Sequence, residues 1–245
     1  MFGISPVALQ SRLEPFLAQL EIKTSDITID QSSDFGELKL IIKYHLNQNQ
    51  PFLKLLKFIN DSFRSYIYSE TFYLSECLID CLKNHHQTVS VAESCTGGLI
   101  SSQITKISGA SSVFDTGFVT YSNRSKMKFL GVDESIILKN GAVSKQTAEA
   151  MVSGLLHATQ SDFGMAVTGI AGPTGGTTEK PNGTVYIGWG SQNNIQTQHF
   201  LIPLPRLEFQ NKVTSIAIHQ LIRFILKEDA AVNYYFDNRS NNFSL

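Results

Sequence analysis

The feature that most constrains the fold is a regular alternation of helix-like and strand-like segments after residue 72. Apolar residues recur at helical spacing in four stretches, 72–83, 97–106, 145–159 and 207–227. Short apolar runs typical of strands cover five further stretches, 88–92, 113–121, 163–168, 183–190 and 195–202. The last two are joined by a polar turn, SQNN, which favours an antiparallel pair. Such alternation predicts a layered α/β domain.

Residues 1–71 follow a different pattern. Of the 17 glycines, only Gly3 and Gly36 precede residue 97. The spacing of apolar residues predicts two helices and three short strands, at 6–20, 51–63, 26–29, 36–43 and 65–69. We therefore expect three parts: a small α+β domain at 1–71, an α/β domain at 72–230 and a frayed, Asn- and Ser-rich tail at 231–245.

The composition indicates a globular protein and argues against several functional classes. With 245 residues, 42% of them apolar and 17% charged, the chain can bury a substantial core, unlike a disordered regulator. A net charge of -1 gives no bulk positive field for nucleic-acid binding. No uncharged apolar run approaches the roughly 20 residues of a membrane helix, and the N-terminus lacks a signal-peptide pattern. We expect a cytoplasmic protein without a membrane or nucleic-acid partner.

The first candidate for chemistry is the segment 89–100, VSVAESCTGGLI, in which a strand runs through small residues into a helix. Peptide N–H groups in the first turn of a helix lack intrahelical partners, so they can stabilise an anion or an oxyanion. Gly97 and Gly98 let a substrate approach the backbone, and Ser94 is placed to act as a nucleophile. The alternative interpretation is that Ser94 or Thr96 only caps the helix.

The second candidate is the segment 117–130, GFVTYSNRSKMKFL, in which Tyr121 ends a strand and Lys126 opens a helix. Both should face the end of the sheet that carries Ser94. A desolvated lysine loses its proton more easily, and neutral lysine can take the proton of a serine hydroxyl. A solvated lysine at a helix start is the alternative interpretation.

The third candidate is the glycine-rich segment 168–184, TGIAGPTGGTTEKPNGT, which follows a strand. Its Lys180 precedes proline and opens no helix, so the segment is not a Walker A loop, and it is not a dinucleotide fingerprint either. We interpret it as a backbone-lined wall for a polar ligand, with Lys180 as a charge partner. A flexible surface hairpin is the alternative.

Cysteines and histidines give no sign of a metal centre. Cys77 and Cys81 lie four residues apart on an apolar helix face, and no histidine is near Cys95 in the chain to lower its pKa. The six histidines show no metal-ligand spacing. We expect neither a metal nor a cofactor.

Several segments resemble the CinA family in their order and spacing over residues 72–226. They are AESCTGG at 92–98, YSNRSK at 121–126, GAVS at 141–144, TGIAGPTGG at 168–176 and EKPNGT at 179–184. Any one of these is a weak signal, but together they are highly specific. The resemblance implies a three-layer α/β/α domain that hydrolyses nicotinamide mononucleotide to nicotinate mononucleotide and ammonia.

The resemblance also implies roles for individual residues. It places a catalytic Ser/Lys pair on Ser94 and Lys126, with Tyr121 as an assistant. The pyridine nucleotide would contact residues of the first and third segments and one arginine: Glu93, Cys95, Thr96, Gly97, Gly98, Gly169, Gly172, Gly175, Gly176, Lys180 and Arg206. No cofactor is implied, and a homo-oligomer is left open.

Two features qualify this resemblance. Residues 1–71 look similar to the small KH-like domain that precedes the module in long CinA proteins, but they lack a Gly-X-X-Gly loop, so RNA binding is not predicted. The family often carries two arginines at the start of its last helix, and here Gln210 replaces the second while Arg206 remains. The alternative functions are a catalytically impaired nucleotide-binding protein and a CinA-like protein associated with competence or DNA damage.

Overall fold

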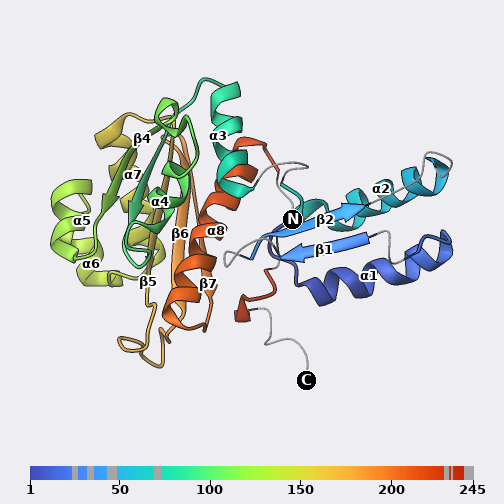
Figure 1. Ribbon diagram of the computed structural model, residues 1–245. Coiled ribbons are helices and arrows are strands. Elements are labelled where there is room, and N and C mark those ends of the chain that lie inside the picture. Colours follow the sequence, from blue (N-terminus) through green and yellow to red (C-terminus); the bar gives the residue numbers. More distant parts are fainter. Residues whose placement is uncertain are drawn as a thin grey trace. The chain divides into compact units, whose positions relative to one another are not determined.

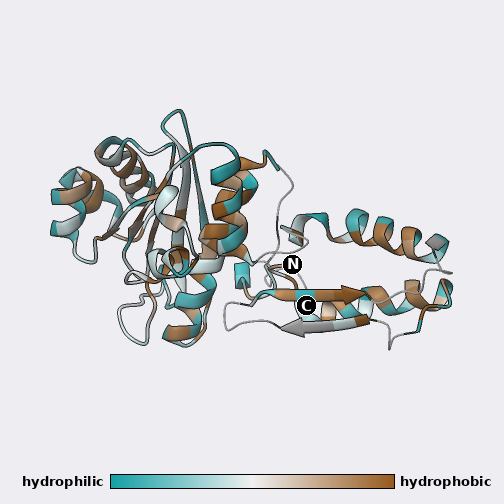
Figure 2. Cartoon of the chain, turned by 45° about the horizontal axis from the view of Figure 1, so that its top comes forward, coloured by the Kyte–Doolittle hydropathy of each residue, from teal (hydrophilic) through white to brown (hydrophobic). Residues whose placement is uncertain are grey.

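The computed structural model describes residues 1–23, 27–31, 36–42, 49–68, 73–228, 232 and 234–239. The chain divides into two compact units, Met1–Thr71 with Ala230–Phe236, and Phe72–Asp229 with Asp237–Leu245 (Figure 1). Each unit has a hydrophobic core of its own. In Figure 2 the helices of both units carry apolar residues on one side and polar residues on the other, as amphipathic helices do.

The first unit combines two helices with a two-stranded antiparallel sheet. Its elements are α1 (Pro6–Gln19), β1 (Ile27–Gln31), β2 (Leu38–Ile42), α2 (Asn49–Phe63) and the single 3-10 turn η3 (Arg64–Tyr66). The Ser5 hydroxyl caps α1 by accepting from the Ala8 N–H, and Pro6 suits the first helical position because it has no N–H to leave unpaired. Leu13, Leu55 and other apolar side chains close the core between helices and sheet.

The strand predicted at 65–69 is wrong in its described part. Arg64–Tyr66 form a 3-10 turn that continues α2, and residue 69 lies outside the described residues. The tyrosines of this stretch alternate with other residues, which gives the sequence the two-residue period typical of a strand. In the fold, Tyr66 packs on the core of the first unit, while the Tyr68 hydroxyl donates to the Glu37 carboxylate at 2.6 Å.

The tail is also more ordered than its composition predicts. Val232, Tyr234 and Phe236 are buried, and in the first unit the Phe2 ring lies 5.3 Å from the ring of Tyr234. The Asn and Ser residues indicate a frayed tail, but the burial of the aromatic residues stabilises this segment. Residues 240–245, also predicted to fray, lie outside the described part of the chain.

The second unit is a five-stranded sheet in the order β4-β3-β5-β6-β7, with helices on both faces (Figure 1). The strands are β3 (Val89–Glu93), β4 (Phe114–Val119), β5 (Phe163–Gly169), β6 (Thr184–Ser191) and β7 (Asn194–Leu201). β3 runs parallel to β4 and β5, whereas β6 is antiparallel to β5 and β7. The predicted α/β fold and the predicted antiparallel pair are confirmed.

Helices cover both faces of this sheet. They are α3 (Leu74–Asn84), α4 (Leu99–Thr105), α5 (Asn123–Leu130), α6 (Glu134–Asn140), α7 (Lys145–Thr159) and α8 (Arg206–Ile225), with a 3-10 turn η4 (Ala110–Ser112) before β4. α7 packs on the sheet together with α5 and α6, and α8 packs on the other face with α3 and α4. None of the helices in the described ranges is both long and apolar enough to cross a membrane.

The topology brings the three candidate segments to one edge. β3, β4 and β5 are parallel neighbours, so their carboxyl ends meet on the same side of the sheet. These ends are Glu93, Val119 and Gly169, and each stands at the start of or inside one of the three segments. β3 is the central strand of the three. All five of its residues are buried, so packing holds this strand in place.

Replacement of Gly154 by Ala should loosen the contact between α5 and α7. A Cβ at this position would lie 1.7 Å from the Leu130 carbonyl oxygen, so the helices must separate. We expect a loss of about 1–3 kcal/mol in the free energy of unfolding, measured by urea denaturation. Ser153→Ala, on an exposed position of the same helix, is the control and should change stability by less than about 0.5 kcal/mol. Equal stabilities would contradict the close helix packing.

Candidate active site

Ser94 lies in the turn between β3 and α4, at the edge where the parallel strands end, and its side chain is largely buried. Gly97 and Gly98 follow with φ angles of +64° and +101°, a left-handed region that glycine adopts without side-chain strain. The Gly97 N–H donates to the Ser94 carbonyl at 3.1 Å and closes the turn. The two glycines therefore build the turn that presents Ser94.

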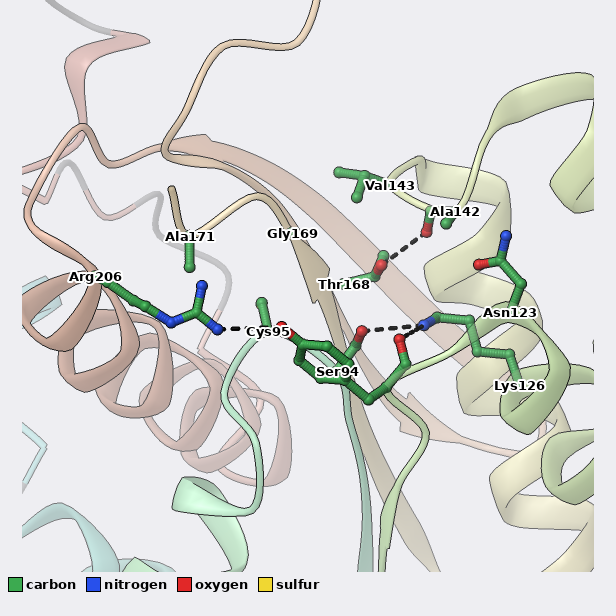
Figure 3. Close-up of a pocket in the computed structure, with 11 residues that line it drawn as sticks. Ser94, Cys95, Asn123, Lys126, Ala142, Val143, Thr168, Gly169, Ala171 and Arg206 are labelled. Carbon is green, nitrogen blue, oxygen red and sulfur yellow. Dashed lines mark hydrogen bonds between the residues drawn. The ribbon is translucent and has the colours of Figure 1, made fainter. Parts of the chain in front are cut away.

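Lys126 contacts Ser94 from a neighbouring element, the first turn of α5. The Ser122 hydroxyl caps this helix. The Lys126 side chain is only 1% exposed, and its Nζ lies 3.0 Å from Ser94 Oγ. Nζ also donates to the carbonyl oxygens of Thr120 at 2.8 Å and Tyr121 at 3.4 Å. Figure 3 shows the side chain directed at Ser94. The two residues predicted to pair are in direct contact.

Burial makes the charged form of Lys126 costly. Removal from water lowers its pKa from the ordinary 10.5 to about 8. A neutral amine has two N–H groups and one lone pair. The N–H groups match the carbonyls of Thr120 and Tyr121, which leaves the lone pair for the hydroxyl proton of Ser94. This arrangement suits a general base.

The pair faces a cavity of about 230 Å³ (Figure 3). Its described lining consists of Ser94, Cys95, Tyr121, Asn123, Lys126, Ala142, Val143, Thr168, Gly169, Ala171 and Arg206. Six of these were predicted for the site: Ser94, Cys95, Tyr121, Lys126, Gly169 and Arg206. None of the lining residues is acidic, so no carboxylate in the lining stabilises the charged form of Lys126.

Tyr121 and Arg206 border the cavity together. Arg206 opens α8 and donates from Nη2 to the Tyr121 hydroxyl at 3.1 Å and from Nη1 to the Gly172 carbonyl at 3.0 Å. The Tyr121 side chain is 62% exposed, and its hydroxyl bonds to neither Ser94 nor Lys126 among the described residues. The phenol thus contacts the guanidinium, and it is the Tyr121 main chain that contacts Lys126.

Glu93 occupies the helix terminus that the sequence predicts as an oxyanion site. Its fully buried carboxylate accepts from the N–H groups of Gly98, Ile100 and Ser101 at 2.9–3.0 Å, and from the Ser101 hydroxyl at 2.7 Å. These N–H groups are therefore not available to a ligand. Glu93 and Gly98 belong to the scaffold of the turn and not to the cavity lining.

Two other N–H groups of the turn are available. Those of Cys95 and Thr96 donate to no backbone or side-chain oxygen in the described part of the chain. Cys95 lines the cavity, whereas the Thr96 side chain is buried outside it. The oxyanion donors expected from the sequence are thereby narrowed to these two.

Comparison with known proteins identifies the family. Residues 72–225 match the sequence profile of the CinA C-terminal domain. The chain belongs to the CinA C-terminal domain family. A CinA-like protein of Colwellia psychrerythraea is 44% identical over 181 residues, which cover 74% of this chain and 42% of that protein. A putative competence-damage inducible protein of Caldicellulosiruptor bescii is 38% identical over 222 residues, which cover 89% of this chain and 54% of that protein. The chain thus spans about half the length of these curated relatives.

Solved CinA structures share the fold. The competence/damage inducible protein CihA from Agrobacterium tumefaciens is 40% identical with a TM-score of 0.60, over 62% of this chain and 93% of that chain. A competence-damaged protein (CinA) superfamily protein from Enterobacter cloacae is 27% identical with a TM-score of 0.59, over 64% of this chain and 95% of that chain. The predicted family resemblance is confirmed.

In this CinA domain Lys180 bonds to the main chain of a loop that lines the cavity. Its Nζ donates to the carbonyls of Asn140 at 2.9 Å and Val143 at 2.8 Å. Val143 lines the cavity, so Lys180 fixes the loop that forms this part of the wall. Two of its three N–H donors bond to protein carbonyls, and Lys180 is not among the lining residues, so the predicted role as a charge partner for a ligand does not match this placement.

The glycine-rich segment divides into a part at the cavity and a part away from it. Gly169 lines the cavity, and Gly172 contributes its carbonyl to Arg206. Gly175 and Gly176 lie outside the lining, in an exposed loop. There the Asn182 amide donates to the Pro173 carbonyl at 2.7 Å. The predicted backbone wall is therefore confined to the start of the segment.

Five lining residues were missed from the sequence: Asn123, Ala142, Val143, Thr168 and Ala171. Each lies inside a segment that the sequence singled out, but none has a side chain that signals chemistry by itself. The Thr168 hydroxyl donates to the Ala142 carbonyl at 2.7 Å and joins two walls. The exposed Asn123 amide has no hydrogen-bond partner within the described residues and faces the cavity as a candidate ligand contact (Figure 3).

Sulfur and metal-ligating groups add little to the site. Burial raises the pKa of the Cys95 thiol to about 12, so this neighbour of Ser94 stays protonated. Cys77 and Cys81 lie on α3 and form no disulfide in the described part of the chain. Across the part of the chain that the structure describes, no three His, Cys, Asp or Glu side chains are grouped to hold a metal ion.

Replacement of Glu93 by Gln should destabilise the nucleophile turn. Gln keeps the size of the side chain, but its amide nitrogen can only donate and would meet backbone N–H groups that also donate. We expect a loss of about 2 kcal/mol in the free energy of unfolding, measured by urea denaturation at pH 7. Glu149→Gln removes a surface carboxylate paired with Lys145 and should cost less than about 0.5 kcal/mol. Similar losses in both variants would refute the scaffold role of Glu93.

Proposed function

We propose that this chain is an amidohydrolase that converts nicotinamide mononucleotide to nicotinate mononucleotide and ammonia. The observation that carries the proposal is the 3.0 Å contact between Lys126 Nζ and Ser94 Oγ in a cavity lined by no acidic side chain among the described residues. Membership of the CinA family and the motif resemblance support the substrate. The direct test is ammonia release from this nucleotide by the purified chain.

The proposed reaction begins with a proton transfer. Neutral Lys126 takes the hydroxyl proton of Ser94 as Oγ attacks the carboxamide carbon, which forms a tetrahedral intermediate with a negatively charged oxygen. In this proposal the N–H groups of Cys95 and Thr96 donate to this oxygen, and such donors typically contribute about 10²–10³ in rate. The Lys126 ammonium then gives its proton to the leaving nitrogen, and ammonia departs.

The second half of the reaction releases the acid. The carbonyl carbon is now esterified to Ser94 Oγ. Lys126, neutral again, takes a proton from water as the water oxygen attacks the ester carbon. When the intermediate collapses, the proton on Lys126 returns to Ser94 Oγ and the product forms as a carboxylic acid. Its remaining proton is lost to the solvent, and nicotinate mononucleotide leaves as a carboxylate. No cofactor is required for either half.

The cavity is small enough to favour part of the nucleotide. A volume of about 230 Å³ suits the pyridine ring and its carboxamide, with the phosphate left at the border. Arg206 lies there with five guanidinium N–H groups, of which it donates two to Gly172 and Tyr121. The remaining donors can bind a phosphate oxygen. Binding of the nucleotide without ammonia release would favour the catalytically impaired alternative.

The first prediction concerns the nucleophile. Ser94→Ala should reduce ammonia release to background and leave the fold intact, because one hydroxyl at a turn contributes little to packing. Cys95→Ser should retain much of the activity, since burial keeps the thiol protonated. Initial rates with each variant, together with circular dichroism, decide the assignment. An active Ser94→Ala and an inactive Cys95→Ser would reverse it in favour of a thiolate.

The second prediction concerns Lys126 and pH. Since the pKa of Lys126 is lowered to about 8, the neutral form grows as the pH rises through 8, and kcat/KM should rise with it. Lys126→Arg should be nearly as inactive as Lys126→Ala, because a guanidinium keeps its proton. Rates of the three proteins from pH 6 to 9.5 provide the measurement. An arginine variant with substantial kcat would contradict the general-base role.

A further inference from the structure

Gln210 contacts the nucleophile turn from a distant part of the chain. Its Nε2 donates to the Cys95 carbonyl at 2.7 Å. Gln210 lies one helical turn after Arg206, so both side chains project from the same side of α8. Arg206 lines the cavity, whereas Gln210 is half-buried and does not. The position where the family often has a second arginine is therefore occupied here by a residue that bonds to the protein.

We propose that Gln210 is a positioning residue for the Ser94 turn, an inference that rests on the proposed amidase function. A trans peptide is planar, so its carbonyl and its N–H point in opposite directions. Because Gln210 on α8 holds the Cys95 carbonyl, the N–H of Thr96 in the same peptide is directed away from Gln210. That N–H donates to no oxygen of the described chain and is one of the two candidate oxyanion donors.

The orientation of the peptide between Cys95 and Thr96 decides whether that peptide stabilises or destabilises the negative charge of the tetrahedral intermediate. With its carbonyl held by Gln210, the peptide offers a donor to the negative oxygen of the tetrahedral intermediate. Rotation of the peptide would replace the donor with a carbonyl oxygen, which repels that charge. Gln210 therefore acts on the transition state through the turn, without touching the substrate.

α8 is held in place by its packing, so it can position the Gln210 side chain. Phe209 and Val213, on either side of Gln210 in the helix, are fully buried, and α8 packs against α4, which follows the turn. Arg206 and Gln210, the two residues of α8 at this site, thus have different roles. Arg206 has N–H groups left for a ligand, and Gln210 has its amide nitrogen bonded to the main chain of the nucleophile turn.

The test compares two readings of Gln210, as a positioning residue and as a phosphate ligand. Gln210→Met keeps the length of the side chain and removes the donor. Glu208→Gln, on the exposed side of the same helix turn, is the control. We expect Gln210→Met to lower kcat by about 10- to 100-fold with KM changed less than about twofold, since small displacements of catalytic groups have effects of this size. The loss should be equal for a pyridine carboxamide nucleotide and for its phosphate-free nucleoside.

A second readout does not depend on amidase activity. A fluorophosphonate forms a covalent bond to an activated serine oxygen with loss of fluoride, and its phosphoryl oxygen needs the same N–H donors. Gln210→Met should slow the labelling of Ser94, followed by intact mass, while Glu208→Gln should label like the wild type. This result would support the inference even if the wild type released no ammonia, an outcome that would refute only the proposed function.

Three results would overturn the positioning role. One is a rise in KM that is confined to the phosphorylated substrate, which would make Gln210 a phosphate ligand. Another is unchanged kcat and unchanged labelling in Gln210→Met. The third is a wild type that the fluorophosphonate does not label at Ser94, because a positioned nucleophile is the premise of the inference.

Discussion

The candidate site depends on one constraint: the Lys126 amine is buried, and no carboxylate in the described part of the chain is paired with it. A buried ammonium loses the solvation of water, and within the described residues only two carbonyl oxygens and one hydroxyl replace it. The environment therefore shifts the amine towards its neutral form and directs its lone pair at Ser94. The parallel strands make this geometry, since β3 ends beside Ser94 and β4 ends just before Thr120.

The remaining contacts keep the nucleophile turn in place. Glu93 holds the turn through two groups. Its main-chain carbonyl accepts from the Thr120 N–H at 2.7 Å, and its carboxylate accepts from N–H groups at the start of α4. The negative charge at the start of α4 is therefore the protein's own carboxylate and not a bound ligand. Lys180 and Thr168 fix the opposite wall through main-chain carbonyls. Glu93, Lys180 and Thr168 therefore stabilise the walls of the cavity. The side chains that remain to meet a ligand are those of Ser94, Asn123, Lys126 and Arg206.

The sequence predicts the fold and the contact between Ser94 and Lys126, but it does not show which polar groups around them bond to the protein instead of to a ligand. Apolar periodicity and glycine placement give the α/β layers, and strand ends followed by small or polar residues give Ser94, Lys126 and the cavity. Glu93 and Lys180 were expected at the ligand, because residue type and motif position do not show whether a charged group bonds to a substrate or to the backbone. The 3-10 turn at Arg64–Tyr66 and the buried tail aromatics depend on contacts between residues far apart in the chain.

A direct titration of Lys126 tests the central claim. The protein would be labelled with carbon-13 at the lysine Cε, and the Lys126 resonance would be assigned by its loss in Lys126→Ala. Its shift, followed from pH 6 to 11, reports the pKa of this amine without reference to any substrate. The account predicts a midpoint near 8, well below the ordinary lysine value of 10.5. A midpoint near the ordinary 10.5 would contradict it, because hardly any of the amine would then be neutral at pH 8.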